Sequence, residues 1–96
     1  MSPLKRKKLS KIRFELDKLD SSLIKLIKKR TNLVKKVLAL KEQKNQIVDQ
    51  KRIKTILSNI KKKSLKNNID PKITNKIWKN MIWAYIDFER RNFKKN

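Results

Sequence analysis

The sequence contains no cysteine, no histidine and no glycine, and it has only two prolines. Without cysteine or histidine there is no disulfide framework, no zinc finger, no thiol nucleophile and no imidazole acid or base, so most familiar hydrolytic mechanisms are excluded. Without glycine there is no glycine-rich phosphate loop, and few tight hairpin turns can form. The long uninterrupted segments that remain favour helix, and we expect an all-α fold.

Acidic residues are also scarce, since 8 Asp and Glu stand against 29 Lys and Arg, for a formal net charge of +21. Such a charge attracts nucleic acid, anionic membrane or a small polyanion, and it does not choose among them. The plainer interpretation is compositional, because runs of lysine usually occupy solvated faces.

Long apolar runs are missing as well. No segment reaches the roughly 18 apolar residues that a membrane-spanning helix needs. The basic start, residues 1–8, lacks the apolar stretch of a signal peptide. We therefore expect a cytoplasmic protein with no membrane partner.

The 96 residues suffice for one domain, and we take 1–96 as that domain, with residues 1–8 as a basic N-terminal tail. From Ile12 onward apolar residues recur at alternating steps of four and three, which predicts a helix from about Lys8 to about Glu42. This helix would be about 50 Å long, more than a compact three-helix monomer needs. A chain of this size buries only a modest core by itself, so we expect a partner along much of the helix.

A second, shorter helix is predicted after a polar loop at residues 43–48. Asp49 suits the N-cap position of this helix. Its apolar face consists of Ile53, Ile56, Leu57 and Ile60. In the lysine-rich residues 61–68 charged side chains replace this apolar pattern.

A third helix is predicted to start at Asp70 and Pro71, an N-cap followed by proline at the first helical position. Its apolar stripe runs from Ile73 to Phe93. The predicted order is a long, a short and a medium helix.

Three charged residues occupy positions within these apolar stripes, namely Arg30, Lys41 and Glu89. Burying such a group unpaired costs several kcal/mol, so each needs an ionic partner or a ligand. Arg30 and Lys41 are 11 residues apart (41 − 30), about 16 Å along one helix face, and their side chains can converge on a small anion. A buried Arg30–Glu89 salt bridge that only fixes register is an equal alternative. Arg13 can reach the same ligand only from an antiparallel second copy.

The residues in this order and spacing resemble the all-helical chorismate mutase family, and the resemblance covers nearly the whole chain. The run from Ile12 to Asp20 is similar to the start of the family's first helix. The matching positions are Arg13, Arg30, Lys41, Asp49, Arg52 and Glu89. The resemblance implies an intertwined helical homodimer with two shared sites.

The implied reaction is the rearrangement of chorismate to prephenate in aromatic amino-acid biosynthesis, the shikimate pathway, without metal or cofactor. Arg30 of one subunit and Arg13 of the partner subunit would hold the two substrate carboxylates with guanidinium forks. Lys41 and Glu89 would donate hydrogen bonds to the ether oxygen, where negative charge builds in the transition state. The rearrangement needs no nucleophile, so positioning and electrostatic stabilisation suffice.

The second helix would complete the ring end of the pocket through Asp49 and Arg52, and it departs from the family at the next residue. Many mutases have a Glu there, which binds the substrate hydroxyl, whereas this chain has Ile53. The run from Ile82 to Glu89 is also similar to isochorismate pyruvate lyase, a sister activity with an apolar residue in place of that Glu. The lyase is therefore the second candidate enzyme.

Glu89 carries a mechanistic prediction of its own. A carboxylic acid can donate to the ether oxygen, whereas a carboxylate cannot. We therefore predict that Glu89 works in its protonated form, that the rate falls as pH rises, and that Glu89→Gln flattens the profile.

Two other classes of function compete with an enzyme. One is a basic helical module that binds RNA or DNA; its lysines would lie on every outer face, and its aromatic residues suit packing more than base stacking. The other is a purely structural helical dimer with an inherited, inactive site, and the complete set of matching residues argues against it. We expect a small dicarboxylate, chorismate or isochorismate, as the ligand, and not nucleic acid.

Overall fold

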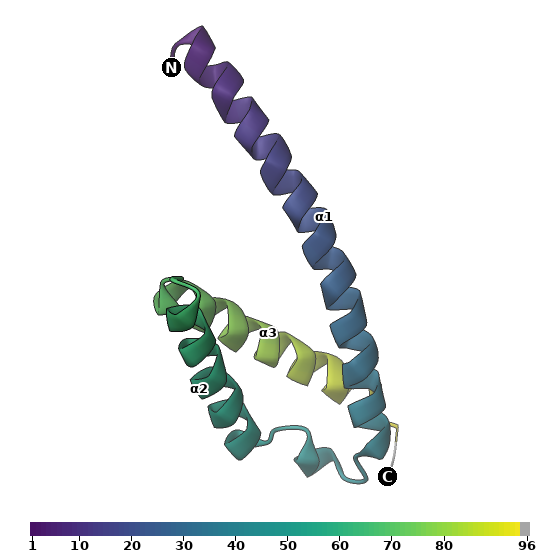
Figure 1. Ribbon diagram of the computed structural model, residues 1–96. Helices are drawn as coiled ribbons and strands as arrows, with labels where there is room; N and C mark the ends of the chain where they lie inside the picture. Colours follow the sequence, from purple (N-terminus) through teal and green to yellow (C-terminus); the bar gives the residue numbers. More distant parts are fainter. Residues whose placement is uncertain (95–96) are drawn as a thin grey trace. The chain divides into compact units, whose positions relative to one another are not determined.

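The computed structural model describes residues 1–94, which form three α-helices and one short 3-10 helix, with no strand in that range. In chain order the elements are α1 (Pro3–Leu40), η1 (Lys44–Gln46), α2 (Gln50–Lys66) and α3 (Pro71–Asn92) (Figure 1). The all-α fold of a long, a short and a medium helix is confirmed. None of the helices within the described residues is long and apolar enough to cross a membrane.

The chain divides into two compact units, Met1–Leu33 and the residues from Val34 onward. The first unit consists of most of α1, which begins at Pro3 and so earlier than the predicted Lys8. Ser2 and Pro3 provide the start signal, because the Lys5 N–H donates to Ser2 Oγ at 3.2 Å and proline suits the first helical turn.

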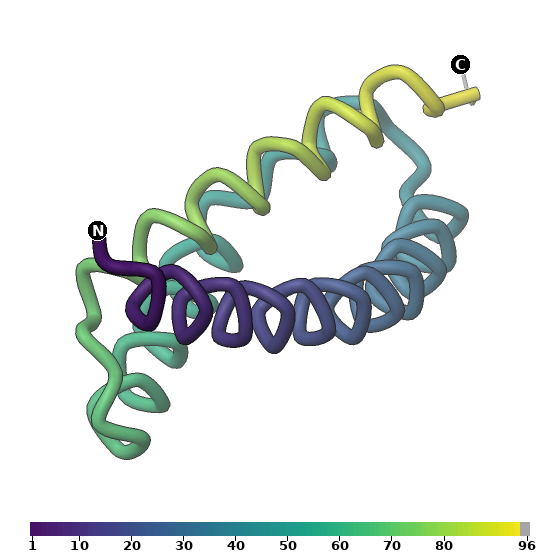
Figure 2. The backbone as a smooth tube through the Cα atoms, turned by 90° about the horizontal axis from the view of Figure 1, so that it is seen from above, coloured from purple at the N-terminus to yellow at the C-terminus, as the bar shows by residue number. Residues whose placement is uncertain are grey.

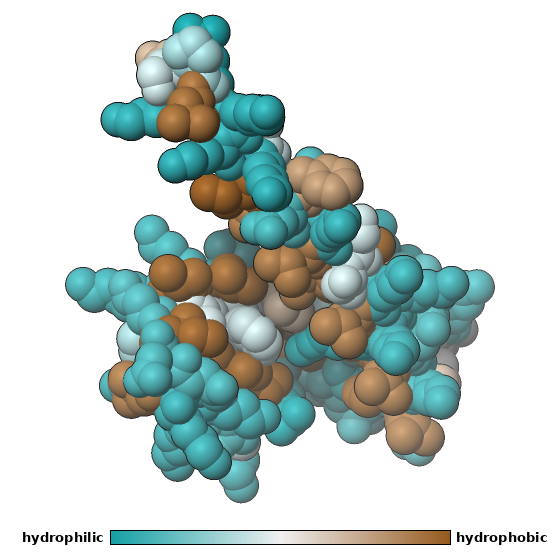
Figure 3. Space-filling model, turned by 45° about the horizontal axis from the view of Figure 1, so that its top comes forward, coloured by the Kyte–Doolittle hydropathy of each residue, from teal (hydrophilic) through white to brown (hydrophobic). Residues whose placement is uncertain are grey.

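Helix α1 has apolar side chains but no core of its own. None of its residues from Pro3 to Leu40 is buried. Large apolar side chains along it are exposed, among them Ile12, Leu16, Leu19, Leu23, Leu26 and Leu33. Brown apolar side chains accordingly lie at the surface of the N-terminal part of α1 among teal charged ones in Figure 3. Most helical stability in proteins comes from packing an amphipathic face, and in a single chain the apolar stripe of α1 lacks such packing.

The second unit contains the hydrophobic core. Helices α2 and α3 run antiparallel and are joined by a short turn (Figures 1 and 2). Three buried isoleucines form the centre of the core, Ile47, Ile82 and Ile86. Partly buried residues pack around them: Val48, Ile53, Ile56, Leu57 and Phe93. The loop before α2 therefore contributes a central core residue, which its polar composition did not predict.

Both predicted helix starts are confirmed. Asp49 is the N-cap of α2, and its Oδ1 accepts a hydrogen bond from the Arg52 N–H at 3.0 Å. Asp70 is the N-cap of α3, and its Oδ1 accepts from the Lys72 N–H at 2.9 Å. An aspartate at this position satisfies backbone N–H groups that have no partner within the helix.

Helix α2 continues beyond Ile60, where its apolar pattern ends, to Lys66. Lysine is a good helix former, so the helix needs no apolar residue at every inward position. The next inward position is Ser64, which is 2% exposed and donates from Oγ to the Ile60 carbonyl at 2.6 Å. Ser64 Oγ also lies 2.6 Å from Thr74 Oγ1 of α3. Asn68, at φ 56, takes the left-handed conformation that often follows a helix end.

Candidate active site

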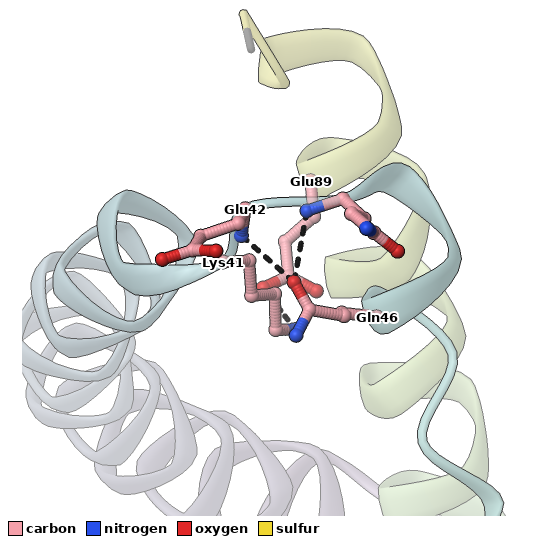
Figure 4. Close-up of polar contacts among 5 residues, drawn as sticks. Lys41, Glu42, Gln46 and Glu89 are labelled. Atoms are coloured by element: carbon pink, nitrogen blue, oxygen red, sulfur yellow. Dashed lines mark hydrogen bonds and ion pairs between the residues drawn. The ribbon is translucent and has the colours of Figure 1, made fainter. Parts of the chain in front are cut away.

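The central polar contact of the second unit joins Lys41 to Glu89. Lys41 Nζ donates to Glu89 Oε1 at 3.0 Å (Figure 4). The Glu89 side chain is 7% exposed and the Lys41 side chain 18%. A charge removed from water to this extent requires a partner of opposite sign, and each of these residues supplies it to the other. Throughout residues 1–94, every buried side-chain nitrogen or oxygen has a hydrogen-bond partner.

Glu89 is positioned by α3. It follows Ile82 and Ile86 at helical spacing, so the three residues share one face of the helix. Ile82 and Ile86 belong to the core, and Glu89 is itself buried at 5% exposure. The carboxylate therefore lies at the edge of an apolar cluster, where an electrostatic interaction is stronger than in water.

Lys41 is positioned by the end of α1. It is the first residue after the helix, and its N–H still donates to the Leu38 carbonyl at 3.1 Å. Its side chain is long enough to reach Glu89 from there, although 48 residues separate the two in sequence. The fold thus brings together the two residues that the sequence analysis assigned to the ether oxygen.

Gln46 organises the turn that follows Lys41, a role that the apolar pattern of the sequence did not predict. The backbone N–H groups of Glu42 and Gln43 both donate to Gln46 Oε1, at 2.7 and 2.8 Å (Figure 4). The Gln46 N–H donates in return to the Gln43 carbonyl at 3.1 Å. A signal was available in the sequence, since Gln43 and Gln46 have the spacing of a capping box.

The three site candidates of the second helix lie in its first turn and at its N-cap. Asp49 and Arg52 are exposed, and the Asp49 carboxylate already accepts a bond from the Arg52 backbone. Ile53 is half-buried and packs against the core isoleucines. Its apolar side chain is thus accounted for by packing as well as by the proposed ligand contact.

The two remaining candidates, Arg13 and Arg30, lie on α1 in the first compact unit. Arg13 is exposed and Arg30 is half-buried. Lys41 and Glu89 belong to the second unit, where the Lys41 ammonium bonds the Glu89 carboxylate. The roles of both arginines stay predictions.

The paired lysine and glutamate suit hydrogen bonding to an oxygen that gains negative charge. The Lys41 ammonium has three N–H donors, and Glu89 Oε1 uses one of them. Donors held in a site with little water stabilise a developing charge far better than water does. Residues 1–94 contain no group of three or more acidic side chains close enough to hold a metal ion.

Comparison with known proteins gives one family. Residues 12–90 match the family model described as chorismate mutase type II. The matched range includes every candidate site residue, from Arg13 to Glu89, and the resemblance seen in the sequence is confirmed. No curated protein and no solved structure matches the chain.

Proposed function

The chain belongs to the chorismate mutase type II family, and from this membership we propose that it rearranges chorismate to prephenate in the biosynthesis of aromatic amino acids. The observation that supports this proposal most directly is the Lys41–Glu89 pair, with its N–O distance of 3.0 Å and its burial beside the core. The reaction breaks the bond between the ether oxygen and the ring while a carbon–carbon bond forms between the enolpyruvyl group and the ring, so a donor at that oxygen accelerates it and no nucleophile is needed.

Lys41 and Glu89 have complementary parts in this proposal. Without substrate the ammonium and the carboxylate bind each other. With substrate, a second N–H of Lys41 donates to the ether oxygen, and Glu89 donates to the same atom once it carries a proton. Both bonds become stronger as negative charge builds on the oxygen, which lowers the barrier instead of merely tightening substrate binding.

In this proposal the arginines bind the substrate. Arg30 and Arg13 of the partner subunit hold the two carboxylates, because a guanidinium group forms two parallel hydrogen bonds to a carboxylate. Asp49 and Arg52 complete the ring end, next to Ile53. In this proposal residues 1–96 work as one domain, in the cytoplasm and without metal or cofactor.

A second copy of the chain covers the exposed stripe of α1. Leu19, Leu23 and Leu26 are 60%, 53% and 58% exposed. A contiguous apolar surface of this kind marks an interaction site in a soluble protein. A homodimer buries the stripe on both copies, and it also supplies the Arg13 that each site requires from its neighbour.

The test is a direct assay in which purified protein receives chorismate or isochorismate separately and the products are identified by chromatography. Prephenate from chorismate supports the mutase. Salicylate and pyruvate from isochorismate favour the lyase instead, and the apolar residue at Ile53 supports that alternative. Absence of turnover with both substrates refutes the enzymatic proposal.

A mixing experiment tests the shared site. Arg13→Ala and Lys41→Met are each expected to form inactive homodimers, because each breaks both sites. In the mixed dimer one site carries both changes and the other carries neither, so an equal mixture should recover about a quarter of the wild-type activity. Continued absence of activity, after exchange of subunits has been verified by mass spectrometry, contradicts the shared site.

A further inference from the structure

We propose that Gln46 is a positioning residue for Lys41. Its side-chain amide oxygen holds the turn after α1 in one conformation, and this directs the Lys41 ammonium toward Glu89. The consequence for catalysis rests on the proposed function, because the same ammonium group is assigned there to the ether oxygen.

The segment from Lys41 to Ile47 is attached to one face of α3 at both ends. At its start, Lys41 Nζ bonds Glu89 Oε1 at 3.0 Å. At its end, Ile47 is 3% exposed and packs with Ile82 and Ile86. Glu89 and Ile86 are one helical turn apart, so both attachments lie on neighbouring positions of α3. The conformation of the residues between them determines where the Lys41 side chain begins.

Gln46 determines that conformation through a single oxygen atom. Backbone pairing of α1 ends with the Lys41 N–H, which donates to the Leu38 carbonyl. The next two N–H groups, of Glu42 and Gln43, both donate to Gln46 Oε1, at 2.7 and 2.8 Å. An amide oxygen has two lone pairs, so one side chain accepts both bonds. Figure 4 shows Gln46 reaching back over the turn toward Glu42, with Lys41 and Glu89 adjacent.

The turn is exposed, so a change at Gln46 can alter the position of Lys41 without preventing the chain from folding. Glu42, Gln43 and Gln46 are all exposed, so water can replace Gln46 as the acceptor. Loss of the acceptor then loosens the turn without leaving a buried group unpaired, so the variant still folds. A loosened turn moves the start of the Lys41 side chain, and small displacements of a donor reduce a rate strongly.

Gln46 acts as a hydrogen-bond acceptor, so the test variants either remove or keep the accepting oxygen. Gln46→Leu keeps the approximate size and removes the oxygen. Gln46→Glu keeps an oxygen at the same distance from the backbone, so it should restore the turn. Gln50→Leu is the matched control, because Gln50 is an exposed glutamine in the first turn of α2.

The first measurement needs no substrate. Amide hydrogen exchange followed by NMR should show slow exchange at Glu42 and Gln43 in the wild type, faster exchange in Gln46→Leu, and slow exchange again in Gln46→Glu. Urea unfolding of Gln46→Leu, Lys41→Met and the double variant should show that the two changes are coupled, since Gln46 acts on the Lys41–Glu89 bond.

The second measurement is steady-state turnover of chorismate. Gln46→Leu should lower kcat by about tenfold or more with little change in KM, because the misplaced ammonium acts mainly in the transition state. Gln46→Glu should recover most of the loss, and Gln50→Leu should match the wild type. In the Lys41→Met background, Gln46→Leu should cause no further loss.

The outcomes separate this inference from the proposed function. If the wild type does not act on chorismate but exchange and unfolding behave as described, the enzymatic proposal fails and the positioning of Lys41 stands. If the unfolding changes are additive, the positioning is overturned whatever the activity. If the wild type is active and Gln46→Leu retains the kcat of Gln50→Leu, or Gln46→Glu restores nothing, the inference is overturned while the proposed function stands.

Discussion

The two compact units of the chain use their apolar side chains in opposite ways. In the first unit, the apolar stripe of α1 contains no buried residue, and Leu23 is 53% exposed. In the second unit, a few residues suffice for a core, since Ile47, Ile82 and Ile86 are between 3% and 6% exposed. An exposed apolar stripe is typical of an interaction surface, and a buried charge beside a core is typical of a functional site.

This difference implies a division of work. The first unit carries the exposed stripe proposed for assembly and the two arginines proposed to bind carboxylates, Arg13 and Arg30. The second unit carries the Lys41–Glu89 pair, proposed to act on the ether oxygen, and the turn proposed to position Lys41. Changes in the first unit should therefore act on assembly and substrate binding, and changes in the second on the chemical step.

The largest effect is expected from Lys41→Met, which removes the donor from the second unit. We expect kcat to fall by about 10²–10³-fold, as is typical when one donor to a developing oxyanion is lost. The far-ultraviolet circular dichroism spectrum should be retained. Lys36→Met is the control, because Lys36 is an exposed lysine of α1. Its kcat should fall by less than about twofold, as expected for a surface change. A kcat for Lys41→Met within a few-fold of wild type would contradict the division of work.

A comparison of Leu23→Ala with Ile86→Ala tests whether the α1 stripe is covered in solution. Ile86→Ala should lower the free energy of unfolding by about 2–5 kcal/mol, as core truncations do. We expect about 2 kcal/mol for Leu23→Ala as well, despite its exposure in the single chain, because a second copy buries it. The melting temperature should also rise with protein concentration. A cost below about 0.5 kcal/mol for Leu23→Ala, the level of ordinary surface changes, would mean that the stripe stays in water.

The pH dependence tests the second unit alone. In the proposed role Glu89 donates to the ether oxygen only when protonated, so low pH supplies this donor and rising pH removes it. The value of kcat should therefore fall as pH rises, as expected for a group that acts as an acid. Glu89→Gln donates through its amide at every pH and should give a flat profile. Complete inactivity of the Gln variant would refute this role for Glu89.

The helices were predictable because their signals are local. Asp49 caps α2 and the Asp70–Pro71 pair starts α3, and each signal acts within one helical turn. The periodicity also placed Lys41 and Glu89 in inward positions, but pattern alone could not select the cation that faces Glu89, since that contact spans 48 residues. Tertiary contacts of this range depend on how the helices pack, which local spacing does not determine.

The features that the sequence did not predict share another cause, because in them polar side chains stabilise the structure through hydrogen bonds. Gln46 closes a turn with its amide oxygen, and Ser64 fills an inward position of α2 with a hydroxyl group. In a pattern of apolar periodicity both residues are interruptions. Hydrogen bonds to the backbone can replace an apolar contact at such positions, because they leave no polar group unpaired.

The smallest effect is expected from Ser64→Ala, which belongs to the second unit but not to its chemistry. Ser64 Oγ bonds the Ile60 carbonyl and Thr74 Oγ1, and Thr74 Oγ1 can still donate to the Pro71 carbonyl at 3.3 Å once the serine hydroxyl is gone. The free energy of unfolding should therefore fall by only about 1 kcal/mol. Ser58→Ala, an exposed serine of the same helix, should change it by less than about 0.5 kcal/mol.

Ser64→Ala should leave kcat unchanged, because Thr74 and Glu89 are 15 residues apart on α3 (89 − 74), about 22 Å along the helix. Unfolding in urea and turnover of chorismate, measured on the same preparation, check both parts of this prediction. A loss of stability with full activity separates the packing of the second unit from its chemistry. A fall in kcat of the size expected for Gln46→Leu would instead show that the whole unit, and not the turn after Lys41, positions the Lys41–Glu89 pair.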